Sequence, residues 1–301
     1  MTSRDRLLAM VVPIIWGFNF VVIEWGMPGV PPLLFVAIRF VIVALPAVLF
    51  LVPKPDAPWW VIAAVGSLMS LGQFGFLYVS MHAGMPAGLA SLVLQAQVVF
   101  TIVIAAGILR ERPTVPQVVG VSIGAIGLIV VAGGRSGHIP LAALGLCLLA
   151  ALCWASGNVV ARAAKVPGGL SLTIWSATVV PIPLVLLSLV VDGPNAMADG
   201  LSSFGWQAAL STAYTAVLAS FVGYGIWNTL LARYPSAVVV PWTMLVPPTG
   251  ILTAWLCLGE VPNGPEVAGG VLLVFGVLIA QSVVSMPSRR RLGSDRAANH
   301  S

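Results

Sequence analysis

Apolar runs about 20 residues long recur along the whole chain, and short connections between them hold most of the charges and most clusters of proline and glycine. A helix needs about 20 apolar residues to cross the hydrocarbon core of a bilayer. The pattern therefore predicts an all-α membrane protein with no separate soluble domain. Ten runs qualify as transmembrane helices: residues 7–26, 31–52, 58–81, 86–109, 115–133, 140–164, 170–191, 205–231, 236–258 and 265–285.

Composition supports this interpretation. Of the 301 residues, 59% are hydrophobic and only 8% are charged, and the mean hydropathy is +1.03. Soluble domains have about 25% charged residues. The chain therefore lacks the polar side chains that would cover a surface in water.

The first run follows a short basic segment, as the apolar part of a signal peptide does. Its apolar part extends over about 20 residues, and no small-residue cleavage site follows it. We therefore expect the first run to be retained as a transmembrane helix.

The distribution of basic residues predicts the orientation. With the N-terminus inside, only Arg135 falls in an outer loop, and Arg39 lies within a span. The positive-inside rule then predicts that both termini are cytosolic, with loops 134–140 and 192–204 outside. It also explains the basic tail, 287–301, without nucleic acid as a partner. The inner side collects 12 of the 14 Lys and Arg residues: Arg4, Arg6, Lys54, Arg110, Arg112, Arg162, Lys165, Arg233, Arg289, Arg290, Arg291 and Arg296.

The chain contains an internal repeat. At an offset of 149 residues, six pairs of proline, glutamate and glycine coincide: Pro86 with Pro235, Glu111 with Glu260, Pro113 with Pro262, Pro116 with Pro265, Gly120 with Gly269 and Gly127 with Gly276. Further upstream, Trp16 matches Trp154 at an offset of 138 residues. We therefore predict a first repeat at 1–134 and a second at 135–286, each with five spans.

An odd number of spans has a topological consequence. A five-span unit ends on the opposite side of the membrane from its start, so the second copy enters upside down. Inverted repeats are typical of secondary transporters, which bind substrate near the midplane between the two halves. The sequence thus predicts two inverted five-helix repeats around a central cavity.

Several motifs resemble a known family. WGFNFVV, GMPAGLASLVLQAQ, VGYGIWNTLLARY and the LRE and LGE endings of spans 4 and 9 resemble the EamA-type exporters of the drug/metabolite transporter superfamily. Within that family the chain is most similar to O-acetylserine/cysteine exporters, with aromatic amino-acid exporters as near relatives. The resemblance implies a multi-pass protein of a bacterial inner membrane that exports amino acids or similar metabolites by alternating access.

Two glutamines lie in the middle of the fourth span. On a continuous helix, Gln95 and Gln97 are about 200° apart and cannot share a face. One amide can therefore line a cavity while the other bonds to a neighbouring helix. We favour Gln95 for the cavity.

Aromatic and amide side chains near mid-depth are the candidates for substrate binding. An indole or phenol ring beside an amide suits a zwitterion with a partly apolar side chain. Ordinary helix packing explains the same residues equally well, and the sequence does not separate the two. The candidates are Trp16, Asn19, Tyr78, Gln95, Trp154, Asn158, Tyr224 and Trp227.

Arg39 is the basic residue deepest within a predicted span. A charge at that depth is a functional candidate by default. Its predicted partner is Glu24, near the outer end of the first span. Either this pair is structural, or Arg39 contacts a substrate carboxylate directly.

Prolines mark two equivalent spans. Pro86 and Pro235 begin spans 4 and 9, where a missing N–H is harmless. Pro241, Pro247 and Pro248 interrupt span 9, so we expect a kink there that acts as a hinge or ligand contact.

Rival functions are weaker. Ser156 in WASGN would need a neighbouring histidine to act as a nucleophile. Of His82, His138 and His300, the first two lie at the outer ends of predicted spans, whereas Ser156 lies past the midplane, and His300 lies in the tail. No cysteine or histidine spacing indicates a metal, so we expect no enzyme, metal or cofactor. The remaining alternatives are a passive channel and an exporter of drugs or other metabolites. The energy coupling, the substrate and the oligomeric state stay open.

Overall fold

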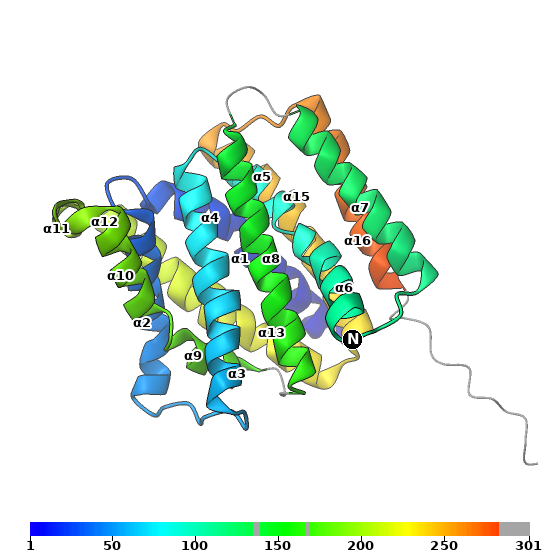
Figure 1. Ribbon diagram of the computed structural model, residues 1–301, viewed down its shortest axis with the longest axis horizontal. Helices are drawn as coiled ribbons and strands as arrows, with labels where there is room; N and C mark the ends of the chain where they lie inside the picture. Colours follow the sequence, from blue (N-terminus) through cyan, green and yellow to red (C-terminus); the bar gives the residue numbers. More distant parts are fainter. Residues whose placement is uncertain (135–138, 166–168, 283–301) are drawn as a thin grey trace, which may run out of the picture.

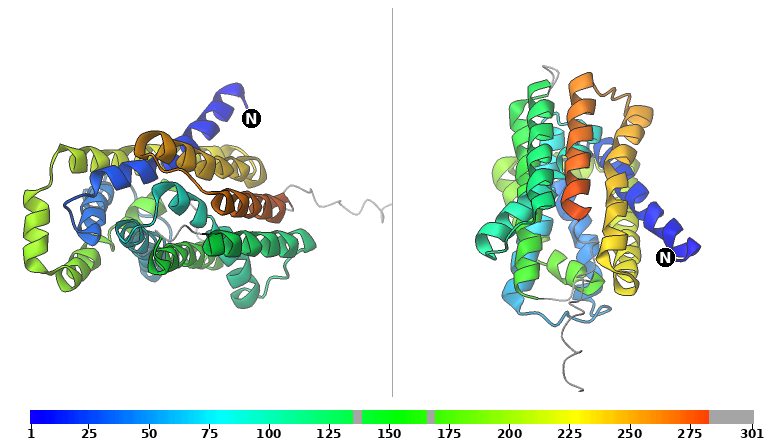
Figure 2. Two further views of the ribbon diagram at one scale, coloured as in Figure 1. Left: turned by 90° about the horizontal axis from the view of Figure 1, so that it is seen from above. Right: turned by 90° about the vertical axis from the view of Figure 1, so that its right-hand side faces the viewer.

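The computed structural model describes residues 1–134, 139–165 and 169–282. The tail predicted at 287–301 and most of the 134–140 loop lie outside this part of the chain. All regular elements within the described ranges are helices, most of them side by side in one bundle (Figure 1). The start of α1 and the end of α16 lie toward the same end (Figures 1 and 2). We call this the near end, and the opposite end, where α5 and α16 begin, the far end.

The helices follow the predicted spans in order. The first half contains α1 (Ser3–Gly26), α2 (Pro32–Val48), α3 (Trp59–Val65), η1 (Gly66–Gly72), α4 (Gln73–His82), α5 (Ala87–Val93), α6 (Ala96–Ile108) and α7 (Val115–Gly134). The second half contains α8 (Leu141–Ala163), α9 (Leu170–Ala177), α10 (Pro181–Val191), α11 (Gly193–Ser202), α12 (Trp206–Ala213), η2 (Tyr214–Gly223), α13 (Tyr224–Arg233), α14 (Ser236–Val239), η3 (Val240–Leu245), α15 (Val246–Leu258) and α16 (Gly264–Ser282).

Several of these helices are long and apolar enough to cross a membrane. A seventh candidate span is formed by α9 and α10, which meet at a bend of 40°, and two shorter apolar helices cover Pro32–Val48 and Gly264–Ala280. Large apolar side chains on the outside of the bundle, such as Ile129 and Val190, are exposed as a lipid-facing surface requires. The six full-length candidates are Ser3–Gly26, Trp59–His82, Ala87–Ile108, Val115–Gly134, Leu141–Ala163 and Trp206–Arg233.

Equivalent helices of the two halves pack against each other through glycine. A Cβ on Gly120 of α7 would meet the backbone O of Gly276 on α16, and a Cβ on Gly269 would meet the O of Gly127. The repeat pairs Gly120 with Gly269 and Gly127 with Gly276, so each contact is the symmetry mate of the other. The internal duplication seen in the sequence is therefore expressed as a pseudo-twofold helix pair (Figure 1).

We expect Gly120→Ala to lower the thermal stability of the protein. The added methyl has no space against the α16 backbone, and overpacking of this kind costs about 1–3 kcal/mol. Gly133→Ala on the same helix is the matched control, because nothing lies within 4 Å of its Cβ position. Melting temperatures in detergent would contradict the close packing if the two variants were equally stable.

Two equivalent spans are irregular at equivalent levels. Span 3 contains the π-helix η1, and span 8 contains the π-helix η2. Span 4, which the sequence predicts as one continuous helix, is broken by a turn at Leu94 and Gln95 between α5 and α6. Span 9 is broken at the corresponding place by the 3₁₀ segment η3. Discontinuous helices at midplane are typical of substrate sites in transporters.

Other differences from the predicted elements are local. Span 7 is two helices because the chain bends before Pro181, which has no N–H to continue α9. The predicted outer loop at 192–204 carries the helix α11. Pro194 is in its first turn, where proline is favoured.

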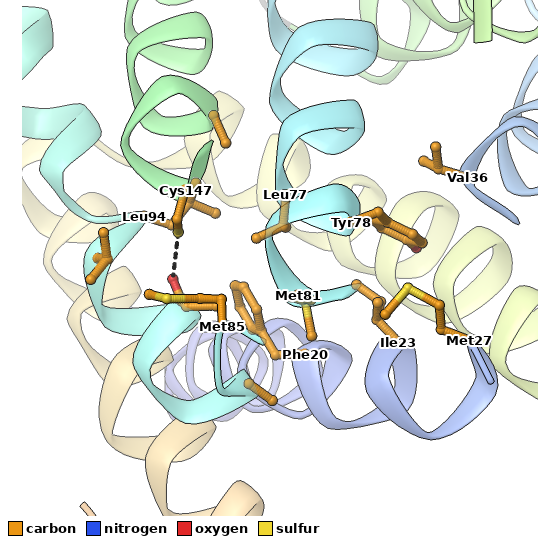
Figure 3. Packing of buried hydrophobic residues seen from close by; sticks show 14 of the residues in the cluster. Phe20, Ile23, Met27, Val36, Leu77, Tyr78, Met81, Met85, Leu94 and Cys147 are labelled. Atoms are coloured by element: carbon orange, nitrogen blue, oxygen red, sulfur yellow. Dashed lines mark hydrogen bonds between the residues drawn. The ribbon is translucent and has the colours of Figure 1, made fainter. Parts of the chain in front are cut away.

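The largest core lies toward the far end, between α1, α2, α4, α5 and α8. In Figure 3, Phe20 and Ile23 of α1 and Met27, which directly follows α1, lie on the side of Leu77 and Met81 of α4. The Ser80 hydroxyl donates to the Ala143 carbonyl at 2.6 Å and fastens α4 to α8. This packing fixes α4, from which Tyr78 extends toward α2.

Candidate functional site

Arg39 is the centre of a buried polar cluster. Only 3% of its surface is exposed. Its Nη1 donates to the Tyr78 hydroxyl at 3.4 Å, and its Nη2 donates to the Ser220 hydroxyl at 3.2 Å. The guanidinium carbon lies 4.3 Å from the centroid of the Phe74 ring. Arg39, Tyr78 and Phe74 belong to the first half and Ser220 to the second, so both halves build this cluster.

The predicted ion pair between Arg39 and Glu24 does not form. Among the described side chains, Arg162 pairs with Glu111 and Arg233 with Asp5. Glu24 lies near the far end of α1, where it interacts electrostatically with Glu260. Its Oε2 is buried without a hydrogen-bond partner. Arg39 instead lies deeper and faces α4 and η2, so the expectation from span ends was wrong.

The π-helix η2 brings Ser220 to Arg39. The Ser220 hydroxyl donates to the Thr215 carbonyl at 2.9 Å, which leaves its oxygen free to accept from the guanidinium. The preceding carbonyl, that of Ala219, accepts from Trp16 Nε1 at 3.0 Å. π-helical turns are frequent at functional sites. Here one such turn connects Arg39 to an aromatic cluster.

This aromatic cluster consists of Trp16, Tyr224 and Trp227. The Trp16 ring centroid lies 5.1 Å from that of Tyr224 and 5.5 Å from that of Trp227. Tyr224 is also within electrostatic range of Arg39. The structure thus places three of the predicted aromatic residues together, beside the cluster of Arg39 and Tyr78.

The two glutamines of span 4 have different surroundings. Gln97 accepts a hydrogen bond from Asn158 Nδ2 of α8 at 3.4 Å. Gln95 lies at the break between α5 and α6, with 5% of its surface exposed, and its Nε2 has no hydrogen-bond partner among the residues that the structure describes. Asn19 is similarly buried, and its Oδ1 has no partner. Buried amides are almost always bonded, so these two free groups are candidates for a ligand.

The remaining predicted binding residues lie on α8. Trp154 packs half-buried against the largest core, and Asn158 follows it by one turn. α8 packs against α4, α6 and η1, whereas the aromatic cluster lies on α1 and α13. The structure therefore places Trp154 and Asn158 in a different part of the bundle from Trp16. Ser156 is half-buried and donates to the Leu152 carbonyl at 2.8 Å.

Glu260 connects the two halves at the far end. Its two carboxylate oxygens accept from the backbone N–H groups of Ala87 and Gly88, each at 2.9 Å. These are unpaired donors of the first turn of α5, which starts directly after Pro86. Beside this contact lies a cavity of about 260 Å³, with Glu260 and Glu266 in its wall. In the sequence, Glu260 stands out only as the residue that matches Glu111 in the internal repeat.

The prolines of span 9 lie at the points where its helix is interrupted. Pro235 directly precedes α14, and Pro241 lies within η3. Pro247 and Pro248 occupy the first turn of α15, where they need no N–H partner. The prolines thus divide the span without leaving helix carbonyls stranded in the middle of α15.

Two polar contacts tie the helices together at the near end. The Tyr234 hydroxyl donates to Asp5 Oδ2 at 2.6 Å, and Arg233 lies 3.7 Å from the other oxygen of Asp5. Arg162 of α8 pairs with Glu111 at 2.5 Å. Both pairs hold the ends of helices that belong to different parts of the bundle.

A second hollow, of about 750 Å³, lies between α1, α12, η2 and α15. Its walls are apolar side chains such as Val21, Leu210 and Leu258, and the Tyr214 hydroxyl donates to the Ile15 carbonyl at 2.9 Å. A groove with these walls has no charged side chain to pair with a zwitterion.

Comparison with known proteins identifies relatives over almost the whole chain. The model of the EamA-like transporter family matches residues 6–133 and again 141–281. A probable amino-acid metabolite efflux pump of Escherichia coli (strain K12) is 40% identical over 93% of this chain and 95% of its own length. Its counterpart in Salmonella typhimurium is 39% identical over the same shares.

Two further similarities are more distant. A probable terminal-alkyne amino-acid exporter of Streptantibioticus cattleyicolor is 32% identical over 71% of this chain and 68% of its own length. A solved crystal structure that is 20% identical superposes with a TM-score of 0.60, over 98% of this chain and all of that one. The latter likeness supports the fold alone.

Proposed function

Because this chain belongs to the EamA-like transporter family, we propose that it exports amino acids or related small metabolites across a bacterial inner membrane by alternating access. The observation that carries this proposal is the buried site shared by the two halves. It joins the Arg39 guanidinium, two hydroxyls and the aromatic cluster of Trp16, Tyr224 and Trp227. The family and the names of the relatives point to transport rather than to enzyme catalysis.

The irregular spans support alternating access. Spans 4 and 9 are broken at equivalent levels, span 4 just before α6 and span 9 at η3. Such breaks provide hinges at which one repeat can move against the other. We assign Pro241, Pro247 and Pro248 to the hinge of span 9, and Pro86 and Pro235 to the ends of the moving segments.

The two halves then correspond to 1–134 and 135–286, each crossing the membrane five times. We place the near end in the cytosol, because most basic residues lie there. A single cysteine at Ser203 should react with a membrane-impermeant maleimide in intact cells, whereas one at Asp56 should react only after lysis. The opposite pattern would reverse the orientation.

Counterflow in proteoliposomes tests the function itself. Protein-dependent accumulation of a radiolabelled amino acid against an unlabelled internal pool should occur, with O-acetylserine, cysteine and aromatic amino acids among the competitors. A passive channel would equilibrate the label without accumulating it. Competition by unrelated drugs alone would indicate an exporter of other compounds. Val130→Ala, on α7 away from the proposed site, should leave counterflow unchanged.

A further inference from the structure

We infer that Arg39 is the anion-binding residue of this site and receives the carboxylate of the transported compound. The inference rests on the proposed function and names the chemistry that a substrate must carry. It starts from an uncompensated charge. Within the described part of the chain, Arg39 has hydrogen bonds only to the hydroxyls of Tyr78 and Ser220, and its Nε has no partner there.

The hydroxyls and rings around Arg39 solvate its charge without neutralising it. A buried charge is normally paired with an opposite charge, yet no carboxylate bonds to Arg39 within the described residues. Phe74 at 4.3 Å and Phe40 at 5.4 Å provide cation–π contacts. These contacts stabilise the buried guanidinium, and a full negative charge would be a better partner for it.

The geometry leaves the guanidinium available to a ligand. The bond to Tyr78 measures 3.4 Å, which is longer than the usual N–H···O distance, and the bond to Ser220, at 3.2 Å, is at the upper limit of the usual range. A planar guanidinium binds a carboxylate through two parallel hydrogen bonds. The Tyr78 hydroxyl accepts from Arg39 and can turn its own hydrogen toward the same carboxylate, whereas the Ser220 hydrogen would first have to leave the Thr215 carbonyl.

The fold itself does not require a charge at this position. Span 7, which corresponds to span 2 in the inverted half, is built from α9 and α10, with the sequences LSLTIWSA and PIPLVLLSLVV. Neither helix contains a charged residue. Arg39 is therefore an addition to one half, as expected for a ligand group rather than for a structural ion pair.

The neighbouring aromatic residues indicate what accompanies the carboxylate. The Phe74 ring lies over the guanidinium, Tyr224 is within electrostatic range of Arg39, and Trp16 packs against both Tyr224 and Trp227. A ligand held at Arg39 would place its side chain among these rings. The site thus fits an amino acid or another small carboxylate with an apolar or aromatic side chain.

Competition in counterflow tests this inference with phenylalanine, phenylalaninamide and phenethylamine as probes. For the wild-type protein, phenylalanine should compete about tenfold or more better than the two probes without a carboxylate. Arg39→Gln should remove this preference and bring phenylalanine within about twofold of its amide. Arg39→Lys, which keeps the charge but loses the planar fork, should give an intermediate preference.

A binding measurement separates failure of the inference from failure of the proposed function. Quenching of the intrinsic tryptophan fluorescence, to which Trp16 and Trp227 contribute, by 3-phenylpropionate and 3-phenylpropionamide needs no transport. If amino acids are transported but carboxylates and amides bind equally well to the wild type, Arg39 has another role and the function stands. If no amino acid is transported, the function fails, and the same two probes still decide whether Arg39 binds carboxylates. The wild-type comparison remains decisive should Arg39→Gln not fold.

Discussion

Replacing Glu260 by glutamine should lower counterflow by about tenfold or more and leave the far end of the molecule open. Both oxygens of Glu260 accept from the first N–H groups of α5, and hydrogen bonds to a charged group contribute about 1.5–3 kcal/mol each. A glutamine retains one acceptor and turns an NH₂ group toward the second N–H. The loss of one of these bonds would disfavour closure of the far end by about 1.5–3 kcal/mol, which shifts a two-state equilibrium toward the open form by about tenfold to a hundredfold.

Labelling from outside measures this opening directly. In a background without Cys147, Cys153 and Cys257, Leu89→Cys lies in the cavity beside Glu260 with 7% of its surface exposed. It should react slowly with an impermeant maleimide, and Glu260→Gln should speed the reaction by about tenfold or more. Unchanged labelling together with normal counterflow would show that Glu260 does not control the far end.

Glu266→Gln is the matched control for this variant. Glu266 lines the same cavity, but its carboxylate accepts from the Asn263 N–H in a reciprocal capping pair at the start of α16. Glutamine serves equally well in such a pair. Glu266→Gln should therefore leave both counterflow and labelling close to the wild-type values.

The spans and the duplication could be predicted from sequence because they depend on local pattern. Apolar runs, prolines and glycines repeat along the chain whatever the helices contact. The reciprocal contact of Gly120 with Gly276 is the three-dimensional form of that repeat. The break at Gln95 could not be predicted, because neither proline nor glycine marks it. The π-helices η1 and η2 could not be predicted either, because they carry no sequence signal of their own.

The surroundings of individual polar residues were the part that sequence could not supply. Depth along a span suggested Glu24 as the partner of Arg39, but depth does not define the direction of a side chain. Ser220, 181 positions further along the chain, is the actual neighbour. A serine in an apolar span carries no signal of its partner, and here Ser220 lies on the π-helix η2 that faces Arg39.

Replacing Gln95 by methionine should reduce counterflow by about tenfold while leaving thermal stability unchanged or higher. The Nε2 of Gln95 is buried without a hydrogen-bond partner. Such a group costs about 1–3 kcal/mol of folding free energy, which an unbranched apolar side chain of similar size restores. If a substrate completes this hydrogen bond, the same change removes binding free energy of similar size. A variant that folds better and transports worse is what a ligand-binding amide predicts.

Gln97→Met provides the opposite pattern and so separates binding from packing. Gln97 accepts from Asn158 Nδ2, so its loss leaves the amide of Asn158 without a partner between α6 and α8. Stability should fall, and counterflow per folded molecule should change less than in Gln95→Met. Melting temperatures and initial counterflow rates, both measured on purified protein, distinguish the two. If Gln95→Met lowers stability as much as Gln97→Met and transports normally, Gln95 is a packing residue and another side chain binds the substrate. Asn19 is then the next residue to test, because its Oδ1 is the other buried amide atom of the first half without a partner among the described residues.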